Sequence, residues 1–190
     1  MLRQGDTGTH LLALTEGLAK VVCRDASGTS AWLAFRGPGD LLGEVSVFNG
    51  TTRSADVIAL NACTTVVLEA RRFRRYVEDN GLTLELMRQT LARLHESDRH
   101  RTELFTLPLV VRLSRALLRL AELCHPKEEL ITVRLIGLTQ EEIAQAVGVT
   151  RSAVITGLQQ LREAGALETA RRVIVIRDVK ALRYWAASVG

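Results

Sequence analysis

The chain has 190 residues, of which 47% are hydrophobic and 24% charged, with a formal net charge of +4. This balance excludes an intrinsically disordered chain, and the length allows one domain or two small domains, each with its own core. No apolar run approaches the roughly 18 residues that a membrane span needs, and no signal peptide precedes the first motif. We therefore expect a cytoplasmic protein without membrane contact.

The cysteines and histidines form no pattern typical of a disulfide framework or a metal site. Cys23, Cys63 and Cys124 are widely spaced and odd in number, and the four histidines are scattered. We expect reduced thiols and no bound metal. Residues 1–80 contain nine basic and nine acidic side chains, so the positive excess lies in the rest of the chain. This excess permits nucleic-acid binding but does not establish it.

The first 70 residues have the pattern of short strands separated by turns. Gly17, Gly28, the Gly-Pro-Gly of residues 37–39 and Asn49-Gly50 separate the runs. Many short strands with regular turns are typical of a sandwich, roll or barrel. A short helix is predicted next, at residues 71–79. The apolar runs of strand length are residues 10–14, 19–23, 31–35, 57–60 and 66–68.

One acid and one base flank a short turn in this region. Glu44 and Arg53 stand nine positions apart, with the small residues Gly43 and Ala55 beside them. Two explanations remain open at this point. The two charges pair with each other as part of the structure, or they face a third group that needs both.

Residues 82–106 predict a long helix with an apolar seam. Its members follow a 3-4 spacing, which suits pairing with a second helix or packing on the helix's own domain. Continuing the register places Asp98 and Arg101 on the seam, where polar groups need a partner, water or a ligand. Pro108 predicts a break at residues 107–109. A second amphipathic helix at 110–123 and a polar loop at 126–129 follow. The seam residues are Leu84, Met87, Leu91 and Leu94.

Residues 138–167 predict a helix, a turn and a second helix. Thr139 with Glu142 forms a capping box, and Gly148 suits a left-handed helix end. The apolar positions are Ile143, Ala144 and Val147 in the first helix and Val154, Leu158 and Leu161 in the second. A small residue and a turn glycine allow the close crossing of a DNA-binding helix-turn-helix.

The second helix and the segment after it carry candidate DNA contacts. Thr150 can cap this helix, and Arg151, Ser152 and Thr156 occupy its exposed side. Arginine suits guanine or phosphate, whereas the two hydroxyls are less selective. Residues 166–169 and 173–176 predict a hairpin with Arg171-Arg172 at its turn, which suits either the phosphate backbone or a solvated loop.

These features in this order closely resemble the cyclic-AMP receptor protein family of bacterial regulators, in the wider group that includes the fumarate-nitrate reduction regulators (Crp/Fnr). The resemblance covers nearly the whole chain and rests on RGPGDLLGE (36–44), TTRSA (51–55), the long helix and LTQEEIAQAVGVTRSAV (138–154). It implies an α+β fold with three parts. These are a cyclic-nucleotide-binding β-roll at 1–80, a dimerisation helix at 81–107 and a winged helix-turn-helix at 108–190.

The resemblance also implies roles for the charged pair. In family members that bind a cyclic nucleotide, the residues matching Gly43 and Glu44 hold the ribose hydroxyl. The residue matching Arg53 pairs with the cyclic phosphate, and Ser54 matches a residue that adds a hydrogen bond there. A carboxylate accepts from a hydroxyl and a guanidinium forks onto a phosphate, so these residue types suit that ligand.

The base and the DNA are read elsewhere in the family. The alignment places Ser97 and Asp98 where the two long helices contact adenine. Asp98 departs from the usual hydroxyl residue, and as an acceptor for adenine's exocyclic amine it favours cyclic AMP, unless it bridges the dimer with Arg101. The residues that the motif places at or near DNA are Thr139, Gln140, Thr150, Arg151, Ser152, Thr156, Arg171 and Arg172.

Two further departures bear on these expectations. The family's roll begins with a strand or two upstream of the pattern at residues 1–6, so we expect an incomplete N-terminus and a less stable roll. In the recognition helix, Arg151 matches the enteric-type protein, but Ser152 and Thr156 replace its acidic residue and its second arginine. The DNA site is therefore not expected to be the enteric one.

We interpret the chain as a homodimeric transcription regulator that is not an enzyme. Cyclic AMP is the expected allosteric ligand, and the expected partners are pseudo-palindromic double-stranded DNA, a second copy and RNA polymerase. Alternatives are a Crp/Fnr-type regulator that responds to another effector or none, and a nucleotide-binding module that regulates a protein partner. No nucleophile–base–acid set and no phosphate-loop signature points to catalysis.

Overall fold

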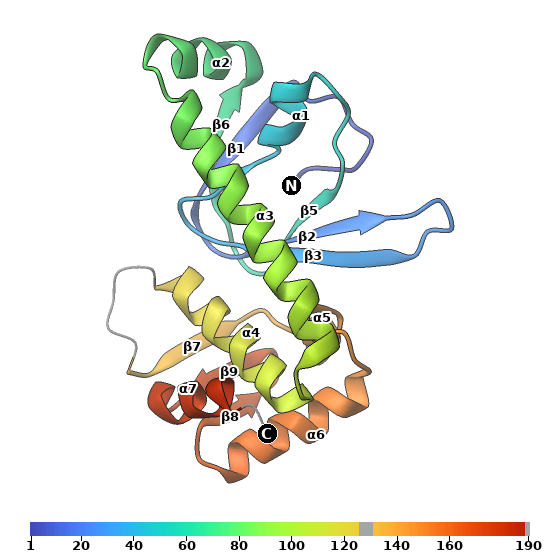
Figure 1. The fold of residues 1–190 in the computed structure, drawn as a ribbon, viewed down its shortest axis with the longest axis vertical. Helices are drawn as coiled ribbons and strands as arrows, with labels where there is room; N and C mark the ends of the chain where they lie inside the picture. Colours follow the sequence, from blue (N-terminus) through green and yellow to red (C-terminus); the bar gives the residue numbers. More distant parts are fainter. Residues whose placement is uncertain (126–130, 189–190) are drawn as a thin grey trace. The chain divides into compact units, whose positions relative to one another are not determined.

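The computed structural model describes residues 1–125 and 131–188 (Figure 1). It divides into two compact units, Met1–Arg101 and Thr102–Gly190. The polar loop predicted at residues 126–129 lies outside the described residues. Within the described ranges, no helix is both long enough and apolar enough to cross a membrane.

Two three-stranded antiparallel sheets build the β-roll of the first unit. Their strand orders are β4-β1-β6 and β3-β2-β5. Each of the five strands predicted in this region corresponds to a strand of the structure. The strands are β1 (His10–Glu16), β2 (Ala19–Arg24), β3 (Ser30–Arg36), β4 (Leu41–Leu42), β5 (Asp56–Ala59) and β6 (Thr64–Glu69).

Strand β1 contributes to two apolar clusters of the roll. Leu12 and Leu14 are buried together with Leu2, Ala19, Leu42 and Val57. Leu11 instead packs with Val47 and Ala70. Successive side chains of a strand point to opposite faces, so one strand serves both clusters. The second cluster anchors the helix that contains Val47.

That helix was not predicted, because the sequence suggested only a short turn between Glu44 and Arg53. Residues Glu44–Asn49 form a six-residue helix, α1. Gly43 precedes it at φ 82° and Gly50 follows it at φ 65°, both in the left-handed region that glycine adopts without strain. The glycines thus fix both ends of α1, and Glu44 begins it.

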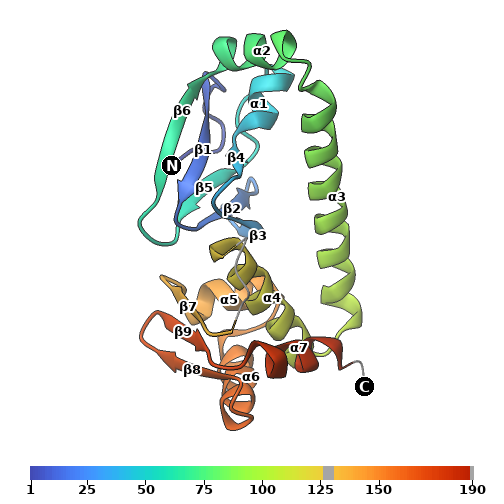
Figure 2. The ribbon, with the colours of Figure 1, turned by 90° about the vertical axis from the view of Figure 1, so that its left-hand side faces the viewer.

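Two further helices follow β6. Helix α2 (Ala70–Asp79) is capped by the Glu69 carboxylate, which accepts from the backbone nitrogens of Arg71 and Arg72 at 2.9 Å each. Helix α3 (Thr83–Thr106) is the long helix predicted from the apolar seam (Figure 2). The four seam side chains, Leu84, Met87, Leu91 and Leu94, are 50–56% exposed. The seam is therefore about half exposed in the single chain.

The second unit combines helices with a three-stranded antiparallel sheet of order β7-β9-β8. Its α4 begins at Leu109, after the break that Pro108 predicted, and buries Leu113, Leu117 and Leu120. Strand β7 and helix α7 were not predicted. The elements are α4 (Leu109–Cys124), β7 (Val133–Ile136), α5 (Gln140–Val147), α6 (Arg151–Glu163), β8 (Leu167–Ala170), β9 (Val173–Ile176) and α7 (Val179–Ala187).

The predicted helix-turn-helix is present as α5 and α6. Thr139 and Glu142 form the capping box, and Gly148 ends α5 at φ 64°. The apolar positions predicted for the two helices are all buried, and Thr150 caps α6 by accepting from the Ala153 nitrogen at 3.3 Å. Strands β8 and β9 form the hairpin predicted after the second helix.

Candidate functional site

Arg53 lies inside the roll, with only 4% of its surface exposed. Its Nη1 donates to the Gly43 carbonyl at 2.6 Å and to Ser46 Oγ at 2.7 Å, and its Nη2 donates to the His10 carbonyl. Burial lowers the pKa of Arg53, and the negative charges of Asp6 and Glu44 oppose that shift. Arg53 therefore presents a buried cation whose hydrogen-bond partners are uncharged oxygens.

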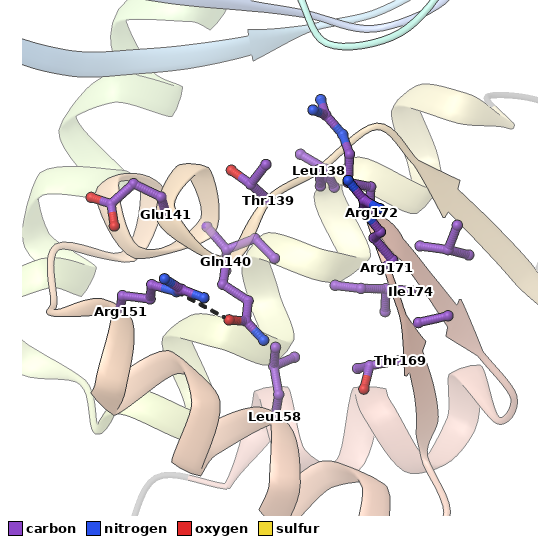
Figure 3. A pocket seen from close by; sticks show the side chains of 13 residues that line it. Leu138, Thr139, Gln140, Glu141, Arg151, Leu158, Thr169, Arg171, Arg172 and Ile174 are labelled. Atoms are coloured by element: carbon purple, nitrogen blue, oxygen red, sulfur yellow. Dashed lines mark hydrogen bonds between the residues drawn. The ribbon is translucent and has the colours of Figure 1, made fainter.

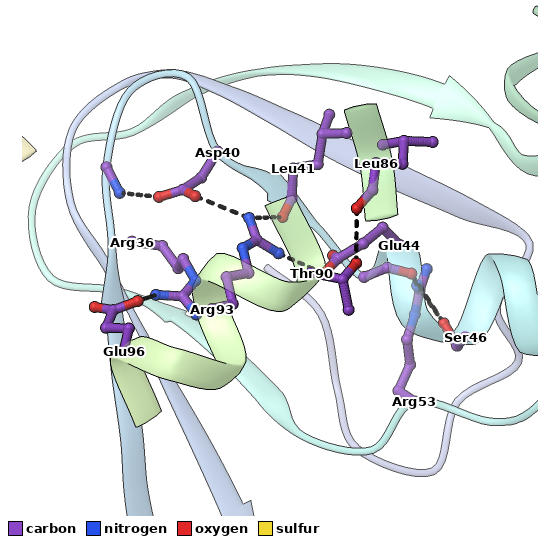
Figure 4. Close-up of polar contacts among 12 residues, drawn as sticks. Arg36, Asp40, Leu41, Glu44, Ser46, Arg53, Leu86, Thr90, Arg93 and Glu96 are labelled. Carbon is purple, nitrogen blue, oxygen red and sulfur yellow. Dashed lines mark hydrogen bonds and ion pairs between the residues drawn. The ribbon is translucent and has the colours of Figure 1, made fainter. Parts of the chain in front are cut away.

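Glu44 pairs with a residue that the sequence did not suggest. Its carboxylate contacts Arg93 of α3 (Figure 4). Arg93 Nη2 also donates to Asp40 Oδ1 at 2.8 Å and to the Leu41 carbonyl at 3.0 Å. The Glu44 side chain is 16% exposed and that of Arg93 is 18% exposed. Of the two explanations for the charged pair, a direct Glu44–Arg53 ion pair is not the arrangement found.

Gly43 explains how the acid and the base come close without pairing. A Cβ at this position would lie 2.3 Å from Arg53 Nη1 and 2.7 Å from a methyl group of Leu2. Only glycine leaves room for the guanidinium beside the start of α1. Ser54 follows Arg53 directly and is exposed. Residues 44–54 thus supply a carboxylate, a guanidinium and a hydroxyl, a donor and acceptor set that suits a sugar phosphate.

Ser97 and Asp98 lie further along α3. Ser97 Oγ accepts from Arg101 Nη2 at 3.3 Å, and Asp98 Oδ1 lies 3.6 Å from the same nitrogen. These contacts run along the helix surface, where the Asp98 and Arg101 side chains are more than half exposed. The preceding residue, Glu96, contacts Arg36 of the roll at 3.5 Å. The two predicted base contacts therefore follow directly after the turn of α3 that is joined to the roll.

In the second unit, a groove of about 500 Å³ lies between the helix-turn-helix and the hairpin (Figure 3). On the helix-turn-helix side of the groove, Arg151 Nε donates to Gln140 Oε1 at 3.2 Å. Four of the predicted DNA-binding residues beside Arg151 line the groove, and Ser152 and Thr156 lie exposed on α6. These four are Thr139, Gln140, Arg171 and Arg172.

Several predicted DNA contacts have structural partners. The Thr139 hydroxyl donates to Glu142 at 2.8 Å and accepts from the Glu142 nitrogen at 3.1 Å. Thr150 caps α6, and its hydroxyl lies 3.0 Å from Ser152 Oγ. Thr156 Oγ1 donates to the Ser152 carbonyl at 3.3 Å. The Thr139 and Thr150 hydroxyls therefore cap α5 and α6, and the Thr156 hydroxyl bonds within α6.

The two arginines at the hairpin turn differ. Arg172 has φ 57°, and its Nη2 donates to the Gly137 carbonyl at 2.8 Å. The Gly137 nitrogen donates in return to the Arg172 carbonyl at 2.9 Å. Arg172 thus ties the hairpin to the segment before α5. Both arginines are exposed.

A further set of buried or half-buried charged residues was not predicted from the sequence. Glu103 is 6% exposed and contacts Arg115 at 3.1 Å and Arg119 at 2.9 Å. Arg112 Nη1 donates to the carbonyls of Leu104 and Val147, at 3.2 and 2.8 Å. These contacts join the end of α3 and the end of α5 to α4. Across residues 1–125 and 131–188, no group of His, Cys, Asp and Glu is arranged to hold a metal ion.

Comparison with protein families decides what this arrangement is. A model of the "Cyclic nucleotide-binding domain" family matches residues 1–80, and a model of the "Crp-like helix-turn-helix domain" family matches residues 111–185. The chain belongs to the Crp/Fnr family of transcription regulators. Both matches fall on the parts of this Crp/Fnr chain where the charged turn and the helix-turn-helix lie.

Individual relatives agree with this assignment. The Crp/Fnr chain is 26% identical over 180 residues to the CRP-like cAMP-activated global transcriptional regulator of Mycobacterium tuberculosis, covering 94% of this chain and 80% of that protein. It is 28% identical over 182 residues to the cAMP-activated global transcriptional regulator CRP of Salmonella typhimurium, covering 93% and 84%. A solved CRP/FNR family regulator from Thermus thermophilus matches with 28% identity and a TM-score of 0.76, covering 100% and 95%.

Proposed function

We propose that this Crp/Fnr family member is a homodimer whose binding to DNA is controlled by a cyclic nucleotide, with cyclic AMP as the leading ligand. The observation that carries the proposal is the arrangement of residues 43–54. There, a buried guanidinium and a partly buried carboxylate flank α1 inside a cyclic nucleotide-binding domain. Two relatives that are named as cAMP-activated regulators support the choice of ligand.

In the proposed ligand site, Arg53 and Glu44 bind different parts of the nucleotide. Arg53 donates to the cyclic phosphate, which replaces one or more of the uncharged oxygens that now accept from it. Ser54 adds a donor from the same turn. Glu44 has one carboxylate oxygen on Arg93, so we assign its other oxygen to the ribose hydroxyl. Gly43 leaves the space that the Arg53 guanidinium occupies beside the start of α1.

The base is proposed to reach α3 at Ser97 and Asp98. Asp98 can accept a hydrogen bond from the exocyclic amine of adenine, at a position where guanine has a carbonyl that cannot donate. In the absence of the base, Arg101 holds both side chains along the helix. A ligand held by Glu44 at one end and by α3 at the other would link the roll to the helix.

The exposed seam of α3 supports pairing with a second copy. Its four apolar side chains follow the spacing of a helix pair and are half exposed in the single chain. Phe105, 88% exposed, continues the same register nearer the end of α3. Two chains joined in this way would present two copies of α6 to half-sites of a pseudo-palindrome about 34 Å apart. As a regulator of transcription, the dimer is proposed to contact RNA polymerase.

Titration calorimetry of the full chain with cyclic AMP tests the ligand site. We expect saturable binding, strong loss in Arg53→Ala, and weaker binding of cyclic GMP. Arg88→Ala is the matched control, because Arg88 is an exposed arginine of the same unit that pairs only with Glu85 among the contacts described. Absence of binding by a folded wild-type chain, or binding that survives in Arg53→Ala, would contradict the proposal.

A second candidate is a regulator that responds to another effector or to none. One observation favours it, namely that both terminal nitrogens of Arg53 already have protein acceptors. In that case Arg53 would stabilise the roll, and the Arg53→Ala variant would lose thermal stability while neither it nor the wild-type chain bound a cyclic nucleotide. A module that regulates a protein partner without DNA would show no salt-dependent binding to duplex DNA.

A further inference from the structure

The hydrogen bond between Gln140 and Arg151 joins the first residue of α5 to the first residue of α6. Gln140 Oε1 accepts from Arg151 Nε at 3.2 Å, and both side chains face the groove (Figure 3). Gln140 is half-buried and Arg151 is exposed. An exposed arginine is therefore held by a neutral amide that belongs to the other helix of the pair.

Both side chains start from backbone that is fixed by a cap. Thr139 and Glu142 close the capping box one residue before Gln140, and Thr150 caps α6 one residue before Arg151. Groups mounted on rigid helix ends keep their geometry better than groups on loops. Because a cation is unfavourable at a helix N-terminus, the dipole of α6 does not hold Arg151 in place. The acceptor on Gln140 supplies that restraint.

The hydrogen bond from Nε determines which nitrogens of the Arg151 guanidinium remain available to DNA. When Nε is engaged, the two terminal nitrogens remain as a parallel pair of donors. Such a pair matches O6 and N7 of guanine, the commonest specific contact of arginine with DNA. An unrestrained arginine can also turn to a phosphate oxygen, which positions the protein but carries no sequence information.

The hydroxyl groups of α6 and its cap already have partners within the protein, so Arg151 remains the main candidate for a base contact. Thr150 is occupied as a cap and lies 3.0 Å from Ser152 Oγ, and Thr156 donates to the Ser152 carbonyl. We propose that Gln140 is a positioning residue that determines specificity, because it aims Arg151 at a guanine rather than at the backbone. The inference rests on the DNA binding proposed above and assigns Gln140 a role other than phosphate contact.

The test begins by selecting preferred sites from a random pool of DNA duplexes with the full chain in saturating cyclic AMP. Affinities are then measured for the selected site and its three single-base variants at each guanine of a half-site. In wild type, one guanine should be preferred about tenfold or more, and Arg151→Ala should abolish that preference. Gln140→Ala should reduce it at least about threefold, with the salt dependence unchanged. Gln140→Glu, which keeps an acceptor for Nε, should restore it.

Gln145→Ala is the matched control, because Gln145 is an exposed glutamine of α5 that does not line the groove. Thermal unfolding establishes that each variant is folded. The proposal is overturned if Gln140→Ala weakens all sequences equally and lowers the salt dependence, as loss of a phosphate contact would. It is also overturned if discrimination is unchanged, or if no guanine preference depends on Arg151. Absence of any salt-dependent duplex binding by wild type would instead contradict the proposed function.

Discussion

The Arg93 guanidinium of α3 pairs with the Glu44 carboxylate at the start of α1, and it also donates to Asp40 and to the Leu41 carbonyl. One side chain of the long helix therefore holds three groups of the roll (Figure 4). Glu44 is our proposed acceptor for the ribose hydroxyl. The ligand would therefore bind a carboxylate that already pairs with α3.

Replacing Arg93 should weaken ligand binding without removing any proposed ligand contact. Arg93→Ala leaves the Glu44 carboxylate, which is only 16% exposed, without its charged partner. We expect a loss of cyclic AMP affinity of about tenfold, equal to about 1.4 kcal/mol, measured by calorimetry. Arg93→Lys keeps the charge but loses the two-pronged guanidinium, so its affinity for cyclic AMP should lie between those of wild type and Arg93→Ala. If Arg93→Ala bound cyclic AMP with unchanged affinity, Arg93 would not be needed to orient Glu44 for the ligand.

Replacing Glu103 should destabilise the second unit. Breaking a buried ion pair by removing one partner costs about 3–5 kcal/mol, and we expect about 3 for Glu103→Gln because Arg115 and Arg119 are partly exposed. Chemical unfolding measures this loss. Glu122→Gln, a change at an exposed position of α4, is the control. A loss below about 0.5 kcal/mol would mean that the triad contributes nothing measurable.

The same carboxylate predicts a pH dependence. Burial raises the pKa of Glu103, but the charges and hydrogen bonds of Arg119 and Arg115 together outweigh it and hold the pKa below its ordinary value of 4.5. A depressed pKa means that this stabilisation is complete above the unfolded-state value and is lost as the pH falls through the folded-state value. Wild type should therefore lose its stability advantage over Glu103→Gln as the pH falls below about 4.5. An advantage that grew on acidification would contradict the assignment.

The seam of α3 should control the oligomeric state. Leu91→Glu places a charge in the middle of the exposed apolar row, so we expect the dimer to dissociate at concentrations where wild type remains paired. Sedimentation velocity measures the change. Ala92→Glu adds the same charge at an exposed position on the neighbouring side of the helix and should leave the dimer intact. Equal effects of the two variants would exclude the seam as the interface.

The arginines at the hairpin turn should differ in their effect on DNA binding. Arg171→Ala should weaken binding to all sequences and reduce the salt slope by about 1, as expected for one phosphate contact. Arg172→Ala should in addition lower thermal stability, because Arg172 holds the Gly137 carbonyl. Fluorescence anisotropy over a salt series measures the slope. A change of sequence preference in Arg171→Ala would contradict a backbone contact.

Local patterns predicted the elements with strong local signals. The capping box at Thr139, the left-handed Gly148 and the break at Pro108 all depend on neighbouring residues, and all are found in the structure. Strand β7 was missed although residues 133–136 alternate between buried and exposed, and α7 was missed although Asp178 caps it. Both signals were present in the sequence, but in short segments where period and cap are easily overlooked.

The polar contacts around the candidate site could not be predicted in the same way. Glu44 and Arg93 are 49 residues apart in the chain, and Arg53 bonds to the carbonyl of His10, 43 residues away. Such partners follow from the packing of strands and helices, which residue spacing alone does not give. The sequence singled out Glu44 and Arg53, but it could not show that each has a different partner.

The most direct test of the account is the affinity of the full chain for its selected DNA site, measured with and without saturating cyclic AMP. We predict that cyclic AMP raises the affinity of wild type by about tenfold or more, within the usual range of allosteric coupling, and that Arg53→Ala shows no such response. Equal affinity with and without a ligand that binds would contradict the account, because a ligand without differential affinity for the two states cannot control DNA binding.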